Sequence, residues 1–136
     1  MTNQPQVPAA PTSGLSGHYW EGTKRDLLML QRCDNCGKVR HYPQVLCPEC
    51  HTMETSWIRA SGRGTLHSWT IAHHAFHPAF AEATPYILLT VDLEENVRSM
   101  GVADGMDPDA LTLGLPLIAS FRARSDGFKD LIFRLA

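Results

Sequence analysis

All four cysteines of the chain fall into two pairs with the same internal spacing. Each pair has two residues between its cysteines, and ten residues separate one pair from the other. A chain that turns this tightly at each pair directs both sulfur atoms toward one point. Two such turns together offer four thiolates in a tetrahedron, the arrangement that a structural zinc ion prefers. The spacing therefore predicts a structural zinc site whose ligands are Cys33, Cys36, Cys47 and Cys50.

Two other uses of these cysteines are open from the sequence. One is a pair of disulfides, which is typical of secreted chains rather than of closely spaced cysteine pairs inside cells. The other is an iron site of the rubredoxin kind, although ten residues between the pairs suit the short hairpin of a zinc ribbon better. The first pair is followed by Gly37, which tolerates the positive φ of such a turn, whereas His51 follows the second pair and makes it less ideal.

Length and charge limit the function classes that fit this chain. With 136 residues the chain can bury one ordinary core and a small satellite. The net charge is −2 and neither half is basic, which argues against a nucleic-acid partner. No apolar run approaches the ~20 residues of a membrane span, and the first residues lack the features of a secretion signal. We therefore expect a cytoplasmic protein that keeps its thiols reduced.

The sequence before the first cysteine divides into a tail and a short helix. Residues 1–15 are rich in Pro, Ala, Ser and Thr and predict a disordered tail. A short helix is expected around residues 18–25, and together with the ribbon it makes up residues 16–54. Tyr19 and Trp20 give this helix more aromatic surface than it can bury alone. The two rings therefore either pack on the rest of the protein or form an exposed docking surface.

The rest of the chain predicts β structure. Residues 26–32 and 38–42 are expected to form the ribbon hairpin, and residues 56–59 a short lead-in to the later strands. A turn of helix begins at Asp107, which is followed by Pro108. Beyond residue 55, runs with an alternating pattern cover residues 65–73, 86–94, 97–103, 116–124 and 128–135.

Five strands with a short helix between the third and fourth follow the order of an OB-fold. The sequence therefore predicts a mainly β protein: an N-terminal helix and a rubredoxin-like zinc ribbon, then a five-stranded OB-fold barrel over residues 55–136. Another small open β-barrel is the alternative.

Helix, four-cysteine ribbon and barrel, in this order, resemble the zinc-ribbon OB-fold family of acyl-CoA-associated proteins. Asn96 stands where that family often has glycine, and asparagine also tolerates positive φ. The segments that carry the resemblance are Tyr19–Gly22, Leu30–Gly37, Tyr42–Pro43, Cys47–Cys50, Pro85–Tyr86, Val91–Glu94 and Gly114–Leu117.

The resemblance implies a function that composition and spacing do not show. Family members are similar to accessory subunits that pair with thiolase-like enzymes: thiolases, acyltransferases or retro-aldolases that act on acyl-CoA thioesters. In such pairs the partner supplies the catalytic residues. The small subunit completes a hetero-oligomer, helps to form the acyl-CoA channel and carries only structural zinc.

Four histidines suggest catalysis or a second metal instead. His73, His74 and His77 lie close together in sequence, and His67 precedes them on an expected strand. Histidine is the usual general base near neutral pH. However, no serine or carboxylate stands at a recognisable triad spacing, and the cysteines are committed to metal. We therefore expect no catalytic residues and histidines that are exposed or lie in an interface.

The loop after the first barrel strand carries two aromatic residues outside any core pattern. In an OB-fold this loop flanks the binding face, and exposed aromatic rings are common at interfaces. The alternative is that the two rings close the end of the barrel. The residues predicted to face a partner or acyl-CoA are Tyr19, Trp20, His74, Phe76, His77 and Phe80.

Single-stranded nucleic-acid binding is the alternative function, because many OB-folds bind such strands. It needs stacking aromatic residues beside a basic groove. The stacking candidates are Trp69, Tyr86 and Phe121. The candidates for the groove are Arg59, Arg63, Arg98, Arg122 and Arg124. The net charge of −2 disfavours this function.

Overall fold

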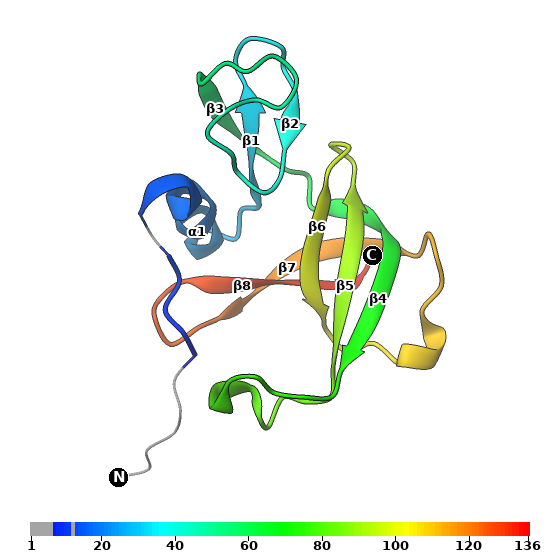
Figure 1. The fold of residues 1–136 in the computed structure, drawn as a ribbon. Coiled ribbons are helices and arrows are strands. Elements are labelled where there is room, and N and C mark those ends of the chain that lie inside the picture. Colours follow the sequence, from blue (N-terminus) through cyan, green and yellow to red (C-terminus); the bar gives the residue numbers. More distant parts are fainter. Residues whose placement is uncertain (1–6, 12) are drawn as a thin grey trace.

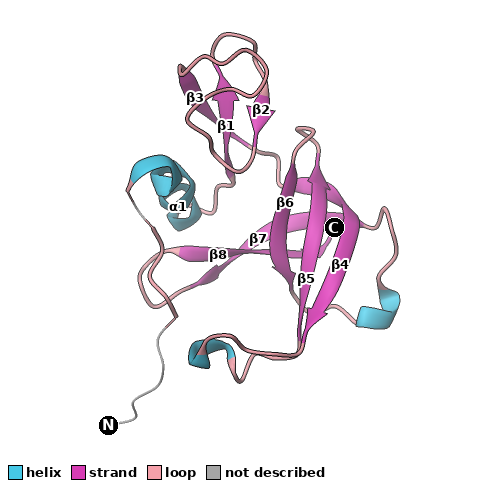
Figure 2. Cartoon of the chain, in the orientation of Figure 1, coloured by secondary structure: helices cyan, strands magenta, loops and turns pink. Residues whose placement is uncertain are grey.

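A three-stranded sheet and a closed five-stranded barrel make up the β structure of the protein (Figures 1 and 2). The computed structural model describes residues 7–11 and 13–136. Residues 1–6 and 12 of the predicted tail therefore lie outside the described residues. Within the tail, the Ala10 amide donates a hydrogen bond of 3.0 Å to Asp126, and the Pro8 carbonyl accepts one from Arg124.

The helix α1 lies between the sheet and the barrel and contacts both (Figure 1). It spans Gly17–Lys24 and follows the 3-10 turn η1, Gly14–Ser16. On the ribbon side, the His18 ring stacks on Trp57 at 5.0 Å. On the barrel side, the buried Thr23 hydroxyl accepts a hydrogen bond of 3.2 Å from the Lys129 amide. The predicted helix is confirmed, and it joins the two β units.

The ribbon sheet has the strand order β2-β1-β3. Its strands are β1, Met29–Cys33, β2, Val39–Arg40, and β3, Thr55–Arg59. The predicted hairpin corresponds to β1 and β2. The sequence placed β3 with the barrel, but β3 pairs with β1 along its whole length instead. This pairing sets Ile58 beside Leu30 and leaves Leu30 fully buried. A domain boundary at residues 54/55 stays a prediction.

The barrel closes in the order β4-β5-β6-β8-β7, and the OB-fold prediction is confirmed. The parallel pair β6–β8 and the antiparallel pair β4–β7 complete the ring. The 3-10 turns η2, Pro78–Phe80, and η3, Pro108–Ala110, lie in its loops. The strands are β4, Arg63–Ala72, β5, Tyr86–Leu93, β6, Arg98–Ala103, β7, Pro116–Ala123, and β8, Lys129–Leu135.

Strand β5 has the alternation that the sequence predicted. Its inward residues are all buried, and they are Ile87, Leu89, Val91 and Leu93. Together with Leu117 and Phe133 from β7 and β8, they form the barrel core. Burying each of these side chains stabilises the fold by about 1.5–3 kcal/mol.

Strand β6 has its larger apolar side chains on the outside of the barrel. Its inward residues are the buried Ser99 and Gly101. A Cβ atom at Gly101 would lie 2.8 Å from the Phe133 ring, which fills the space that a β6 side chain would otherwise take. Met100 and Val102 alternate with these small residues and therefore face outward. No helix in the described part of the chain is long and apolar enough to cross a membrane.

Candidate functional site

The four predicted zinc ligands converge on one point. Their sulfur atoms all lie within 4.8 Å of one another. The Cys33 and Cys50 sulfurs are 3.5 Å apart, as are those of Cys36 and Cys47. All four thiols are free, and a disulfide would need sulfurs about 2.05 Å apart. The geometry fits four ligands around one ion rather than two disulfides.

The two cysteine turns share one backbone geometry. In the first, the Gly37 amide donates a hydrogen bond of 3.0 Å to the Cys33 carbonyl, and Gly37 has a φ of 78°. In the second, the His51 amide donates one of 2.9 Å to the Cys47 carbonyl, with a φ of 62° at His51. The histidine therefore adopts the left-handed conformation that the turn requires, at a cost that glycine avoids.

Hydrogen bonds favour the thiolate at Cys33 and Cys50, whereas burial and the Cys47 thiol raise the pKa of Cys36 to about 11. The Cys36 amide and the Thr52 hydroxyl lower the pKa of Cys33. The Asn35 side chain and Thr52 lower the pKa of Cys50 to about 5. Four sulfurs this close cannot all be charged without a neutralising cation, and a zinc ion supplies that charge. A four-thiolate site has no open coordination position, so its role is structural.

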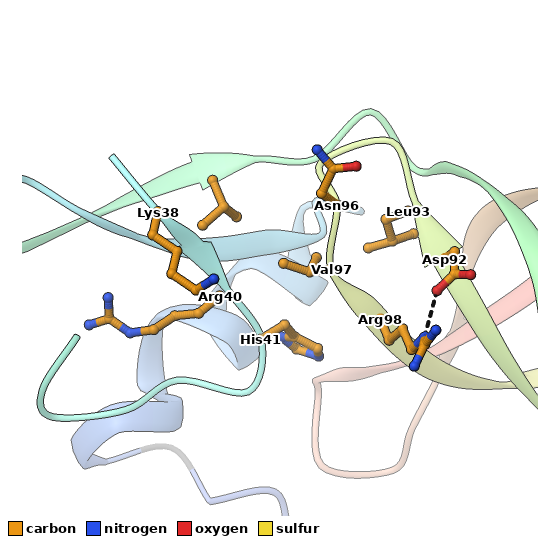
Figure 3. Close-up of a pocket in the computed structure, with 9 residues that line it drawn as sticks. Lys38, Arg40, His41, Asp92, Leu93, Asn96, Val97 and Arg98 are labelled. Carbon is orange, nitrogen blue, oxygen red and sulfur yellow. Dashed lines mark hydrogen bonds and ion pairs between the residues drawn. The ribbon is translucent and has the colours of Figure 1, made fainter. Parts of the chain in front are cut away.

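A cleft of about 580 Å³ separates the ribbon from the β5–β6 hairpin (Figure 3). Arg98 pairs with Asp92 at 2.7 Å and Lys38 with Glu49 at 3.3 Å, whereas the buried Arg40 donates a hydrogen bond of 3.2 Å to the Gln44 carbonyl. Burial lowers the pKa of His41 to about 4, so this imidazole is neutral near pH 7. The cleft thus holds two ion pairs, the buried Arg40 and a neutral histidine.

The two aromatic residues of α1 are both partly buried, in different surroundings. Tyr19 packs against the core, and burial raises the pKa of its hydroxyl. Trp20 meets the Phe128 ring edge-on at 6.3 Å, and the Arg124 guanidinium lies 5.2 Å from its ring centre. Both residues therefore contribute to the fold. Their predicted role toward a partner stays a prediction.

The loop between β4 and β5 presents one aromatic ring to solvent. Phe76 is 94% exposed, with the His74 ring edge-on at 4.6 Å. The His77 Nδ1 accepts a hydrogen bond of 3.0 Å from the Ala79 amide and caps η2, while Phe80 is half-buried. His77 therefore has a local structural role. Within the described residues, the four cysteines are the one group of Cys, His, Asp and Glu arranged for a metal, so the histidines form no second site.

A hollow of about 770 Å³ connects α1 with this loop. Tyr19 and Trp20 line it from one side and Phe80 from the other, so the sequence-predicted residues of the two segments share one depression. Its floor was not predicted from the sequence, and it includes Leu88, Met100, Val102 and Ile132. The sequence of β6 held one signal of this floor. Its large apolar side chains alternate with Ser99 and Gly101, and the small residues take the inward positions that large ones normally fill.

Comparisons with known proteins match both units. The family profile for the ChsH2 rubredoxin-like zinc ribbon domain matches residues 20–54, and that for the ChsH2 C-terminal OB-fold domain matches residues 57–122. A DUF35 domain-containing scaffold protein of Methanocaldococcus jannaschii is 32% identical over 111 residues, which cover 79% of this chain and 78% of that protein. The chain belongs to the DUF35 family. It carries the family's zinc ribbon and OB-fold.

Two solved structures resemble this DUF35 chain. A chain of the structure called "Ltp2-ChsH2(DUF35) aldolase" superposes with a TM-score of 0.83 at 30% identity, covering 93% of this chain and 98% of that one. A DUF35 protein of unknown function from Sulfolobus solfataricus gives a TM-score of 0.62 at 14% identity, over 91% of this chain and 87% of that one, and so shows the fold alone.

Two longer relatives carry enzyme names. The "probable enoyl-CoA hydratase alpha subunit" of Thermomonospora curvata is 34% identical over 109 residues, and 79% of this DUF35 chain is covered. The "3-oxo-4,17-pregnadiene-20-carboxyl-CoA hydratase alpha subunit" of Mycobacterium tuberculosis is 31% identical over 103 residues, with 76% covered. The DUF35 chain spans about a third of each relative: 34% of the first and 32% of the second.

Proposed function

We propose that this chain is a non-catalytic accessory subunit of a thiolase-like enzyme, a thiolase, acyltransferase or retro-aldolase that acts on acyl-CoA thioesters. It completes a hetero-oligomer and helps to form the acyl-CoA channel. The observation that carries the proposal is the match to nearly the whole DUF35 chain of the Ltp2-ChsH2 aldolase. The names "alpha subunit" and "scaffold protein" among the relatives also support a role within a complex.

The side-chain chemistry supports a subunit without turnover of its own. All four thiols are grouped as zinc ligands and cannot serve as nucleophiles. His77 is engaged in capping η2, and His74 packs against an exposed phenyl ring. The partner therefore supplies the reacting groups, and acyl-CoA reaches this subunit only as part of the complex.

The surface that meets the partner includes α1 and the loop of η2. Tyr19 and Trp20 on the helix, and His74, Phe76, His77 and Phe80 on the loop, remain the proposed partner- or acyl-CoA-facing residues. Tyr19, Trp20 and Phe80 line one hollow, which supports treating the helix and the loop as one surface. The exposure of Phe76 supports an anchor that a partner would bury.

Nucleic-acid binding has less support. Phe121, a proposed stacking residue, packs against the barrel core, whereas Trp69 is partly exposed. Arg98, Arg122 and Arg124 each lie within 4 Å of a carboxylate. With three of its five candidate arginines already paired, the groove offers less charge to a phosphate backbone.

Co-expression tests the proposal. The chain is produced together with a thiolase-like protein from the same organism, and the mass of the complex is measured by light scattering after size exclusion. We expect a stable hetero-oligomer, and no binding of single-stranded oligonucleotides by the chain alone. Separate elution of the two proteins, with salt-dependent oligonucleotide binding, would favour the alternative function.

A further inference from the structure

An apolar row crosses the outside of the barrel. The register aligns Leu88 of β5 with Val102 of β6, and Val102 with Ile132 of β8. Ile132 is only 5% exposed, although its neighbours Leu131 and Phe133 are the residues of β8 that belong to the barrel core. Outward positions of a small barrel are normally polar. Three aligned apolar side chains therefore mark this part of the wall as a covered surface.

The neighbouring position on β6 extends the apolar surface toward solvent. Met100 is 46% exposed and lies on the same outer side as Val102. At the inward position of Gly101 on β6 the Phe133 ring takes the place of a β6 side chain. The barrel core therefore does not need large residues on β6, and their presence outside requires a separate reason.

The walls and rim of the hollow suit an uncharged occupant. Trp20 of α1 and Phe80 of η2 both line it. The charged groups at its edge pair with one another: Asp104 with Arg122 at 3.8 Å, and Asp130 with Arg124 at 2.7 Å. A lining of apolar side chains with few charges, each of them paired, is typical of the core of a protein interface.

A projecting side chain beside the hollow distinguishes a protein occupant from a small ligand. Phe76 is 94% exposed and lies four residues before Phe80, which lines the hollow. A small molecule would use the hollow but would leave this ring in water. A protein surface can fill the hollow and also bury the Phe76 ring, because both sides of an interface carry projecting side chains and pockets.

We propose that the outer face of β5, β6 and β8, between α1 and the η2 loop, is the docking site for an apolar segment of the thiolase-like subunit. An apolar side chain of that subunit enters the hollow over Met100 and Val102, and Phe76 enters a pocket of that subunit. This inference rests on the proposed function and names the surface through which it acts. It adds the floor of the hollow to the proposed partner-facing residues of α1 and the loop.

A charge placed in the hollow tests the docking site. In Met100→Arg the new guanidinium stays hydrated in the free chain, because position 100 is half exposed, but would be buried in the complex. We expect the affinity for the co-expressed thiolase-like subunit to fall at least about 30-fold. The matched control is Leu113→Arg, which adds the same charge at a residue that is 75% exposed outside the hollow. The affinity of Leu113→Arg for the thiolase-like subunit should stay within about twofold of the wild-type value.

A second variant and two further measurements separate the other occupants. Phe76→Ala should also weaken binding by about tenfold or more without changing the melting temperature of the free chain. If both variants bind like wild type, the inference is wrong while the proposed function stands. If the wild-type chain itself does not bind the thiolase-like subunit, the inference and the proposed function are both wrong.

The inference is also overturned in two other cases. In the first case the free chain binds decanoyl-CoA and Met100→Arg abolishes this binding, while the affinity for the thiolase-like subunit is unchanged. The hollow would then hold a small ligand. In the second case light scattering shows that the wild-type chain forms a homodimer, and only Met100→Arg dissociates it, while the affinity for the thiolase-like subunit is unchanged.

Discussion

The ribbon and the barrel are organised by different interactions. In the ribbon, four sulfurs within 4.8 Å of one another hold two turns and a three-stranded sheet around one metal site. In the barrel, a core built on Leu89, Val91 and Phe133, all fully buried, holds five strands in a closed ring. One unit therefore depends on coordination by a few residues and the other on packing among many. Each should fail in its own way.

The largest effect is expected from a zinc ligand. Cys47 is fully buried, and Cys47→Ser removes one of four thiolates from a site whose binding contributes about 10–16 kcal/mol to folding in small zinc modules. We expect loss of zinc and fast hydrogen exchange over residues 29–59, with residues 63–135 still protected. Equally fast exchange in both segments would show that the barrel depends on the metal too.

Gly101→Val should destabilise the barrel and leave the zinc site of the ribbon intact. The added side chain would collide with the Phe133 ring, since even a Cβ lies 2.8 Å from it. Overpacking of this kind costs about 1–3 kcal/mol. Urea denaturation of the barrel should shift accordingly, while zinc content stays at one per chain. The control is Thr90→Val on the outer side of β5, and a shift as large in that variant would argue against the clash.

A pH dependence is expected at the junction of the two units. Burial depresses the folded-state pKa of His41 to about 4, so the unfolded chain, with a pKa near 6.5, binds its proton first. The stability that this group contributes is therefore complete above about pH 6.5 and is lost as the pH falls toward 4. His41→Gln should flatten the fall in unfolding free energy over this range by about 2 kcal/mol. If the unfolding free energy of the wild type and of His41→Gln falls in parallel with pH, His41 is not the source of this pH dependence.

The smallest effects should distinguish the two cysteine turns. Gly37→Ala places a Cβ at a φ of 78° and should cost about 1–2 kcal/mol. His51→Gly removes the same strain at a φ of 62° but loosens the unfolded chain, so it should gain less than about 1 kcal/mol. Zinc-saturated denaturation curves measure both. Changes of the same sign would mean that the two turns are not equivalent.

The difference between the units also explains what the sequence could predict. The zinc site depends on spacing within 18 residues, so the four ligands, both turns and the ribbon hairpin followed from local pattern. On β5 the apolar residue at every second position from Ile87 to Leu93 was enough to assign the core side.

Residues brought together by register could not be predicted in this way. The sequence did not predict that β3 pairs with β1, because this pairing joins strands separated by the whole cysteine region. The hollow depends on Val102 meeting Ile132, a parallel contact across 30 residues of sequence. For Tyr19 the sequence left open packing on the protein or a docking surface, and its packing on the core depends on the position of α1 against β1 and β8.

The most direct test of the accessory role compares acyl-CoA turnover by this chain alone, the thiolase-like subunit alone and the two together. We expect no turnover by the chain, weak turnover by its partner and at least about tenfold more by the complex. His77→Ala should then affect only assembly. Turnover by the isolated chain at ordinary enzymatic rates, abolished by His77→Ala, would contradict the accessory role and make this subunit an enzyme.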